Sequence, residues 1–147
     1  MVPRVSLRSA QAADSEFAYQ VLERTMKSYA VATWGKWLER EAHEETSADA
    51  TAGRSQIIQL GTTAVGLLRL DRFETHLQLE QLFIVPEHQR QGIGATVLQA
   101  VISEGRSQGL PVRLRVPRVN PAKEFYSRHG FSVVSETPER FFMERVP

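Results

Sequence analysis

The chain lacks cysteine, long hydrophobic runs and an excess of charge of either sign. Without cysteine it can hold no disulfide framework, no thiolate zinc site and no cysteine nucleophile. Its 18 Lys and Arg residues against 17 Asp and Glu leave a net charge of +1, so no overall field attracts nucleic acid. No apolar run approaches the ~20 residues that span a bilayer, and residues 1–10 lack a signal-peptide layout. We therefore expect a cytoplasmic protein with neither nucleic-acid nor membrane partners.

The length and composition of the chain are typical of one folded domain. The chain has 147 residues, of which 41% are hydrophobic and 24% are charged. This length suits one domain of roughly 100–200 residues, and it suffices to bury a core. We expect residues 1–147 to form a single domain.

The spacing of apolar residues predicts the order β-α-α-β-β-β-α-β-α-β-β. The expected strands are Val2–Leu7, Gln56–Leu60, Thr63–Leu70, His76–Val85, Val112–Val116, Phe131–Ser135 and Arg140–Val146. The expected helices run from Asp14 as N-cap, over Trp34–Glu45, over Gln91–Gln108 and from Asn120 to Gly130. The fold class is α/β (α+β), a mixed, mostly antiparallel sheet of about seven strands with helices on both faces. The unit from His76 to Val116 should be a parallel crossover.

Two local expectations follow from composition. The small residues of Ser47–Gly53 predict a loop. The continuous apolar run Leu82–Val85 predicts a strand buried on both faces.

The segment Gln89–Ala95 carries the clearest functional signal, because glycines stand between an expected strand and an expected helix. Glycine lets the backbone approach a ligand, and the free amides of a helix start attract phosphate. A plain tight turn is the structural alternative. A Walker A loop would need Lys and Ser/Thr after Gly94, where Ala95 and Thr96 stand. A dinucleotide loop would need a small residue at Val97 and an acidic one near Arg118.

The stretch Ile84–Gly94 closely resembles motif A of the GNAT superfamily of acyl-CoA-dependent N-acyltransferases, with Gln89, Gly92 and Gly94 at the motif positions. The stretch Asn120–Phe131 is similar to motif B of that superfamily. The predicted element order is also that of the GNAT fold, so the resemblance covers essentially the whole chain.

The resemblance implies acetyl-CoA as co-substrate. We expect no metal, because no pair of histidines has the spacing of metal ligands. Loop amides would hold the pyrophosphate of acetyl-CoA, the end of the preceding strand would pair with its pantetheine arm, and a bulge there would open a slot for the thioester. The cofactor-binding residues carried over in this way are Leu82, Phe83, Ile84, Arg90, Gln91, Gly92, Ile93, Gly94, Ala95 and Asn120. Asn120 stands six residues before Tyr126, where seven is commoner, and it could equally be only a helix cap.

Two residues are candidates for proton transfer. By the resemblance, Tyr126 is the general acid that protonates the leaving CoA thiolate, with packing in the core as the structural alternative. Glu80, four residues before Ile84, is the candidate base, and Gln78 and His76 on its face could hold a water relay. A solvated surface carboxylate is the alternative for Glu80.

The resemblance implies that the acceptor is a primary amine of a small molecule or peptide and that its site is covered by the first two helices, where the aromatic segment Tyr29–Trp37 stands. We name Tyr29 and Trp34 as substrate-binding candidates, with ordinary helix packing as the alternative. The acidic residues of Glu39–Glu45 could favour a basic acceptor or simply form a solvated face.

The predicted activity is acetyl transfer from acetyl-CoA by direct attack in a ternary complex, because no cysteine can carry a covalent acetyl group. A non-catalytic acyl-CoA-binding sensor or docking module is the competing interpretation. The terminal strands could also pair across a homodimer.

Overall fold

A computed structural model describes residues 4–147 and contains one seven-stranded sheet in the order β1-β2-β3-β4-β5-β7-β6. The strands are β1 (Val5–Ser9), β2 (Gln56–Leu60), β3 (Thr63–Arg72), β4 (Leu77–Ile84), β5 (Val112–Pro117), β6 (Ser132–Glu136) and β7 (Arg140–Arg145). The helices are α1 (Ser15–Trp34), α2 (Glu39–Thr51), α3 (Ile93–Gln108) and α4 (Ala122–Arg128), with 3₁₀ turns η1 (Ala12–Asp14) and η2 (Pro86–His88). The predicted fold class and element order are confirmed.

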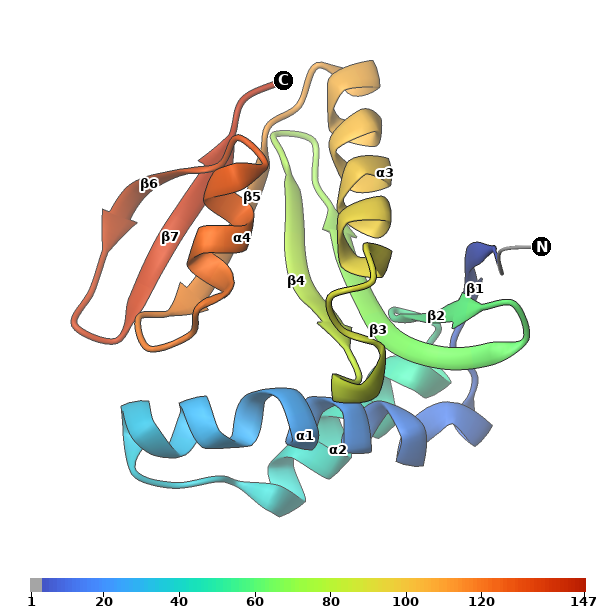
Figure 1. The fold of residues 1–147 in the computed structure, drawn as a ribbon. Coiled ribbons are helices and arrows are strands. Elements are labelled where there is room, and N and C mark those ends of the chain that lie inside the picture. Colours follow the sequence, from blue (N-terminus) through green and yellow to red (C-terminus); the bar gives the residue numbers. More distant parts are fainter. Residues whose placement is uncertain (1–3) are drawn as a thin grey trace.

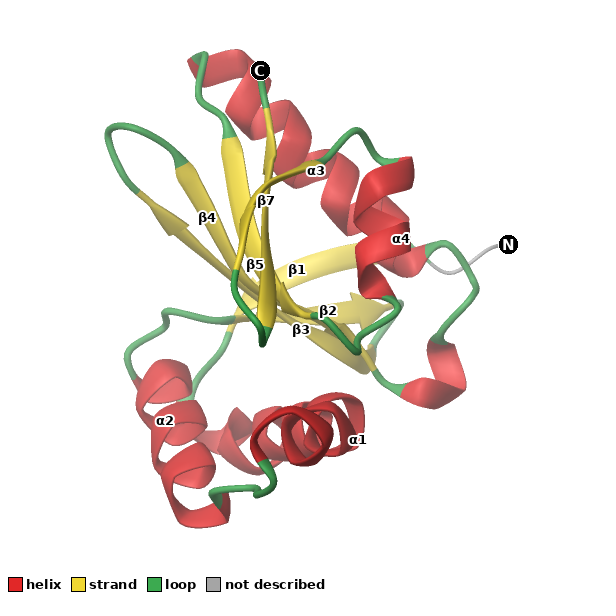
Figure 2. Ribbon diagram, turned by 90° about the vertical axis from the view of Figure 1, so that its left-hand side faces the viewer, coloured by secondary structure: helices red, strands yellow, loops and turns green. Residues whose placement is uncertain are grey.

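The helices form two layers around the sheet. Figure 2 shows α1 and α2 on one face and α3 and α4 on the other. Successive side chains along a strand point to opposite faces of the sheet. In β5 this places Val112, Leu114 and Val116 in the core and leaves Arg113 and Arg115 exposed. The core lies mainly between the sheet and α3, whose stripe of Val97, Leu98, Val101 and Ile102 is buried.

Among the described strands only one neighbouring pair is parallel, β4 with β5, and this pair separates early. Their register includes only two pairs, Leu77 with Val112 and Gln78 with Arg113. The other neighbours in the described sheet are antiparallel. Figure 1 shows the result: β1–β4 with α3 diverge from β5–β7 with α4, and α1 runs across the open end.

The start of α1 differs from the expectation. Asp14 does precede the helix, but its carboxylate does not cap it. Instead it accepts hydrogen bonds from both terminal nitrogens of Arg8, at 2.9 Å each, and from the amide of Gln11 at 2.8 Å. The Arg8 guanidinium lowers the pKa of Asp14. The predicted capping bond is therefore wrong, because a bidentate arginine pair takes the carboxylate.

The loop predicted at Ser47–Gly53 is also wrong for most of its length, because α2 continues to Thr51. Tertiary contacts fix this segment as helix. Ala50 is fully buried, and the buried carboxylate of Asp49 binds Arg54 and Arg69 at 2.9 and 3.0 Å. The predicted helix start at Trp34 is likewise displaced, since Gly35 ends α1 with a left-handed φ of 77°.

No helix within residues 4–147 combines the length and apolar character that crossing a membrane requires.

Candidate active site

A β-bulge in β4 opens the sheet beside β5. Arg69 of β3 pairs with Gln81 and Leu70 pairs with Leu79, so Glu80 is the extra residue between them. Beyond this bulge, Leu82, Phe83 and Ile84 pair with β3 on one edge and have no β5 partner on the other. The expected bulge is confirmed, and beyond it one edge of this strand end has no partner strand within residues 4–147.

The same three residues correct a prediction about burial. Leu82, Phe83 and Ile84 are only half-buried, and Val85 alone of the run Leu82–Val85 is buried. The sequence Leu82–Val85 is apolar throughout because one side of the strand packs in the core while the other side lines a cleft. Within residues 4–147, no second helix covers that other side.

This main cleft has a volume of about 490 Å³ and lies between β4, the glycine loop, β5, α4 and α1. Most of the predicted site residues line it, from four separate elements. They are Tyr29, Glu80, Leu82, Phe83, Ile84, Arg90, Gly92, Ile93, Gly94, Ala95, Asn120 and Tyr126. Gln91 does not line it, since its side chain donates to the carbonyl of Glu87 at 3.4 Å.

The glycine loop has the backbone geometry of an anion-binding turn. Arg90 and Gly92 both have positive φ values, 62° and 81°, which is uncommon for a residue such as arginine. Gly92 is the N-cap of α3, so the first amides of this helix have no partner within it, and the residues that carry them, Ile93–Ala95, line the cleft. A Cβ at Gly94 would lie 3.7 Å from the Phe125 ring and 3.8 Å from the Ile84 side chain, which shows how narrow the cleft is here.

Gln89, a motif position, has a structural role. Its side-chain amide donates to the carbonyl of Ile84 at 2.8 Å. This bond closes the loop onto the end of β4 and so fixes the distance between the unpaired strand edge and the loop amides.

Asn120 lies at the cleft and also caps α4. Its Oδ1 accepts from the amide of Ala122 at 2.9 Å, and its Nδ2 lies 3.9 Å from the sulfur of Met26. The capping role is therefore present, while a second donor proton of the same amide stays available at the cleft wall.

Tyr126 is buried among Phe125 and Phe131, whose rings lie edge-on at 5.3 and 5.6 Å. Burial raises the pKa of its phenol. Within residues 4–147 its hydroxyl has no hydrogen-bond partner, although the residue lines the cleft. Tyr126 thus adds to the cleft lining a protonated phenol whose donor is unused among residues 4–147.

Glu80 lies at the mouth of a second space, which we call the side chamber. Its carboxylate is 3.7 Å from the guanidinium of Arg115. Gln78 and His76 line neither the main cleft nor the side chamber, so the residues predicted to hold a water relay are not brought to the site. His76 instead stacks on Phe73 at 5.0 Å.

The side chamber has a volume of about 520 Å³ and lies under α1 and α2. The two spaces are adjacent, because five residues line both: Met26, Glu80, Phe83, Arg115 and Pro117. Trp34 lines the side chamber, whereas Tyr29 lines the main cleft. Glu41 and Glu45 of the acidic run stand exposed at the α2 side of this chamber.

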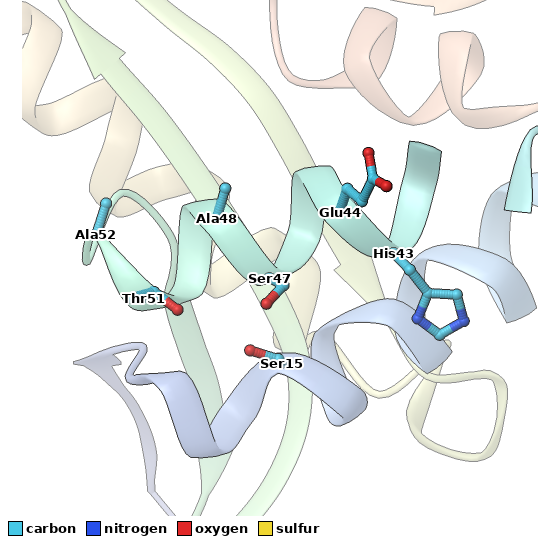
Figure 3. A pocket seen from close by; sticks show the side chains of 7 residues that line it. All are labelled: Ser15, His43, Glu44, Ser47, Ala48, Thr51 and Ala52. Carbon is cyan, nitrogen blue, oxygen red and sulfur yellow. The ribbon is translucent and has the colours of Figure 1, made fainter. Parts of the chain in front are cut away.

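A separate groove of about 670 Å³ lies between α2 and the start of α1 (Figure 3). Ser47 and Thr51 of α2 point toward Ser15 across it, and His43 and Glu44 lie at one end. None of the motif residues lines this groove, so it is not the candidate site.

The acetyltransferase (GNAT) domain model matches residues 21–147, most of the chain. The chain belongs to the GNAT acetyltransferase family. No curated protein matches it at a significant level.

Solved structures of GNAT proteins share its fold. The acetyltransferase of Thermus thermophilus is 20% identical with a TM-score of 0.79, covering 100% of both chains. The PaiA N-acetyltransferase of Thermoplasma acidophilum, in complex with coenzyme A, is 20% identical with a TM-score of 0.75, covering 98% of this chain and 99% of that one. The ribosomal-protein-S18-alanine N-acetyltransferase of Escherichia coli is 19% identical with a TM-score of 0.71, covering 97% and 94%.

Sequence reasoning missed several residues of this GNAT site. They include Arg115 and Arg140, which line the side chamber, and His88, which lines the main cleft with a buried Nδ1 that has no partner among residues 4–147. Arg115 could have been found from the alternation of apolar and charged residues in β5, which places Arg113 and Arg115 together on the face away from the buried valines. Arg140 reaches the chamber only through the pairing of β7 with β5, which no local pattern indicates.

The described residues contain no group of three His, Asp or Glu side chains that could hold a metal ion.

Proposed function

We propose that this protein is an N-acetyltransferase that moves the acetyl group of acetyl-CoA to a primary amine. One observation carries the proposal: Glu80 from β4 and Tyr126 from α4 line a single cleft, where β4 leaves β5 and the glycine loop begins. The solved complex of a relative with coenzyme A and the family of the chain support the choice of co-substrate.

In this proposal the main cleft binds acetyl-CoA through backbone groups. The amides of the loop around Arg90–Ala95 hold the pyrophosphate, and the unpaired edge of Leu82–Ile84 pairs with the pantetheine arm as an added strand would. Asn120 donates its free amide proton to the same ligand. A free amide of the bulged strand polarises the thioester carbonyl.

The chemical step is direct attack by the amine nitrogen on the thioester carbon. Glu80, directly or through water, takes the proton that the ammonium must lose. The carbon–sulfur bond then breaks, and Tyr126 gives its phenolic proton to the departing thiolate. The nitrogen loses its second proton as the amide forms, and this proton returns to the Tyr126 phenolate directly or through water. The products are an N-acetylated amine and CoA, and no covalent acetyl-enzyme forms.

The acceptor enters through the side chamber, where Trp34 forms part of its wall. Tyr29 lies where the chamber and the cleft approach each other along α1 and bounds the reacting end. The acceptor is a small molecule or a peptide, and one relative acts on an alanine of a ribosomal protein.

We further propose that residues 1–147 act as one domain, that the enzyme works in the cytoplasm, and that two copies associate through edge strand β6. Every residue of β6 is exposed, Val134 by 61%, and β6 has a neighbour on one side only. Gel filtration with light scattering would show a monomer if this association does not occur.

The decisive experiment measures the thermal midpoint with and without acetyl-CoA, with NADPH and ATP as controls. A ligand at about 100 times its Kd stabilises a protein by ~2.7 kcal/mol, which raises the midpoint of such a chain by several degrees. CoA release is then followed with a panel of amines. No shift with acetyl-CoA would overturn the proposal, and a shift without CoA release would leave only a binding module.

A further inference from the structure

The side chamber contains more positive than negative charge on its sheet side. Arg69, Arg115 and Arg140 all line it there, whereas Glu80 is its only carboxylate from a described strand. Arg69 is already neutralised, since Asp49 and Asp71 each lie 3.0 Å from its guanidinium. Arg115 has the more distant Glu80 at 3.7 Å.

Arg140 is half-buried and forms no ion pair with any carboxylate among residues 4–147. Its guanidinium lies 4.6 Å from the centre of the Trp34 ring, which fixes its position against the chamber wall. Burial lowers the pKa of Arg140, the positive charge of Arg115 lowers it further, and the negative charge of the adjacent Glu139 offsets only part of this shift. An unpaired cation held in this way favours an anion beside it.

Arg140 and Arg115 occupy one face of the sheet. Arg115 pairs with Phe142 and Pro117 with Arg140 in the β5–β7 register, so the two arginines are diagonal neighbours. Two guanidinium groups on this diagonal can share one carboxylate. Glu41 and Glu45 of α2 repel a carboxylate in the chamber only weakly, because both are exposed to water and Arg40 lies 3.3 Å from Glu41.

The geometry points to a small acceptor that carries a carboxylate as well as its reactive amine, with Arg140 and Arg115 holding the carboxylate and Trp34 covering the apolar part between. This inference rests on the proposed acetyl transfer. A chamber of about 520 Å³ has the size of a small-molecule site, which favours a free amino-acid-like compound over a long peptide.

The test compares amines that differ only in the carboxylate. CoA release is measured at saturating acetyl-CoA for L-phenylalanine against phenethylamine, and for 4-(aminomethyl)benzoate against benzylamine. We expect kcat/KM for the acid of at least one pair to be about 10- to 100-fold higher, the range for a hydrogen bond to a charged group. The peptides Ala-Asp-Ala and Ala-Asn-Ala form a third pair, and a preference seen only there would overturn the assignment to a small molecule.

Variants assign the preference to its residue. Arg140→Gln should bring the ratio within each pair to about 1, while Arg140→Lys should retain part of it. Arg113→Gln is the matched control, because Arg113 shares the face of Arg115 but binds Glu144 at 2.8 Å and does not line the chamber. A ratio that survives in Arg140→Gln, or neutral amines that equal their acids in the wild type, would overturn the inference.

A binding measurement separates this inference from the proposed function. Calorimetry on the CoA-saturated protein compares 3-phenylpropionate with 3-phenylpropanamide, neither of which has an amine to acetylate. Tighter binding of the acid that is lost in Arg140→Gln supports the carboxylate site even if no amine releases CoA. Equal binding of the two overturns the site even if acetyl transfer is observed.

Discussion

The main cleft and the side chamber share Glu80, Phe83 and Arg115, but the chain builds them in different ways. In the proposed function, acetyl-CoA binding in the main cleft depends mainly on backbone groups of one continuous segment, the bulged end of β4 and the loop to α3. The side chamber depends on side chains from α1, α2, β3, β4, β5 and β7. Backbone recognition tolerates changes of side chain, whereas the chamber changes with each substitution. These two constructions fit the proposed function, in which acetyl-CoA binds in the main cleft and the acceptor amine binds in the side chamber.

The largest expected effect concerns the acid in the main cleft. Tyr126→Phe should lower kcat by about 10²- to 10⁴-fold, because the thiolate would leave without a proton. The midpoint shift with acetyl-CoA should persist, since the backbone contacts remain. Steady-state kinetics measures the first and thermal melting the second. An unchanged kcat would remove Tyr126 from the mechanism.

The same tyrosine gives a prediction about pH. Burial raises its pKa above the ordinary 10.0, so the protonated form persists to higher pH than in a free tyrosine. The wild-type rate should therefore show no decline from tyrosine ionisation up to about pH 10, as a pH–rate profile would report.

The next effect concerns the residue where both spaces meet. Glu80→Gln should lower kcat by about 10²-fold near neutral pH, because the amine loses its proton acceptor. The deficit should shrink as pH rises and more of the amine is already neutral. Parallel pH–rate profiles test this, and a constant deficit at every pH would assign Glu80 a positioning role instead.

A smaller effect tests whether the main cleft is held by its loop closure. Gln89→Ala removes the bond to the Ile84 carbonyl and should weaken acetyl-CoA binding by about 3- to 10-fold, with the acceptor KM little changed. Calorimetric titration measures this. Gln99→Ala, at an exposed position of α3, is the control. Equal affinities of the two variants would contradict the role of the closure.

The smallest expected effect tests whether the main cleft and the side chamber are independent. An ion pair connects α1, which lines the side chamber, to the segment beside the glycine loop, which lines the main cleft. Arg24 of α1 binds Glu87 beside the glycine loop, and this lowers the pKa of Glu87 from 4.5 to about 2. The pair adds stability above the unfolded-state pKa, and this is lost as pH falls toward about 2. Since both side chains are exposed, Arg24→Gln should lower the midpoint at neutral pH by about a degree or less and leave it unchanged in strong acid. A large change in acetyl-CoA affinity would show that the regions are coupled.

The sequence predicts the main cleft better than the side chamber, because contiguous residues form much of the cleft whereas residues far apart in the chain form the chamber. Strand, glycine loop and helix start are contiguous, so local spacing indicates the arrangement of Leu82–Gly94. Arg140 enters the chamber through the register of β7 on β5, and Asp49 folds the segment Ser47–Thr51 into helix through its contact with Arg69. Contacts between distant residues decide both, and they leave no local pattern.

The connection between α1 and α2 has a consequence for engineering. Gly35 ends α1 in a left-handed conformation, and the residues after it, Lys36, Trp37 and Leu38, all line the side chamber. This short segment contributes no residue to the main cleft. Under the proposed function, a library that varies residues 34 and 36–38 and keeps Gly35 would alter the choice of acceptor without changing any residue that lines the main cleft.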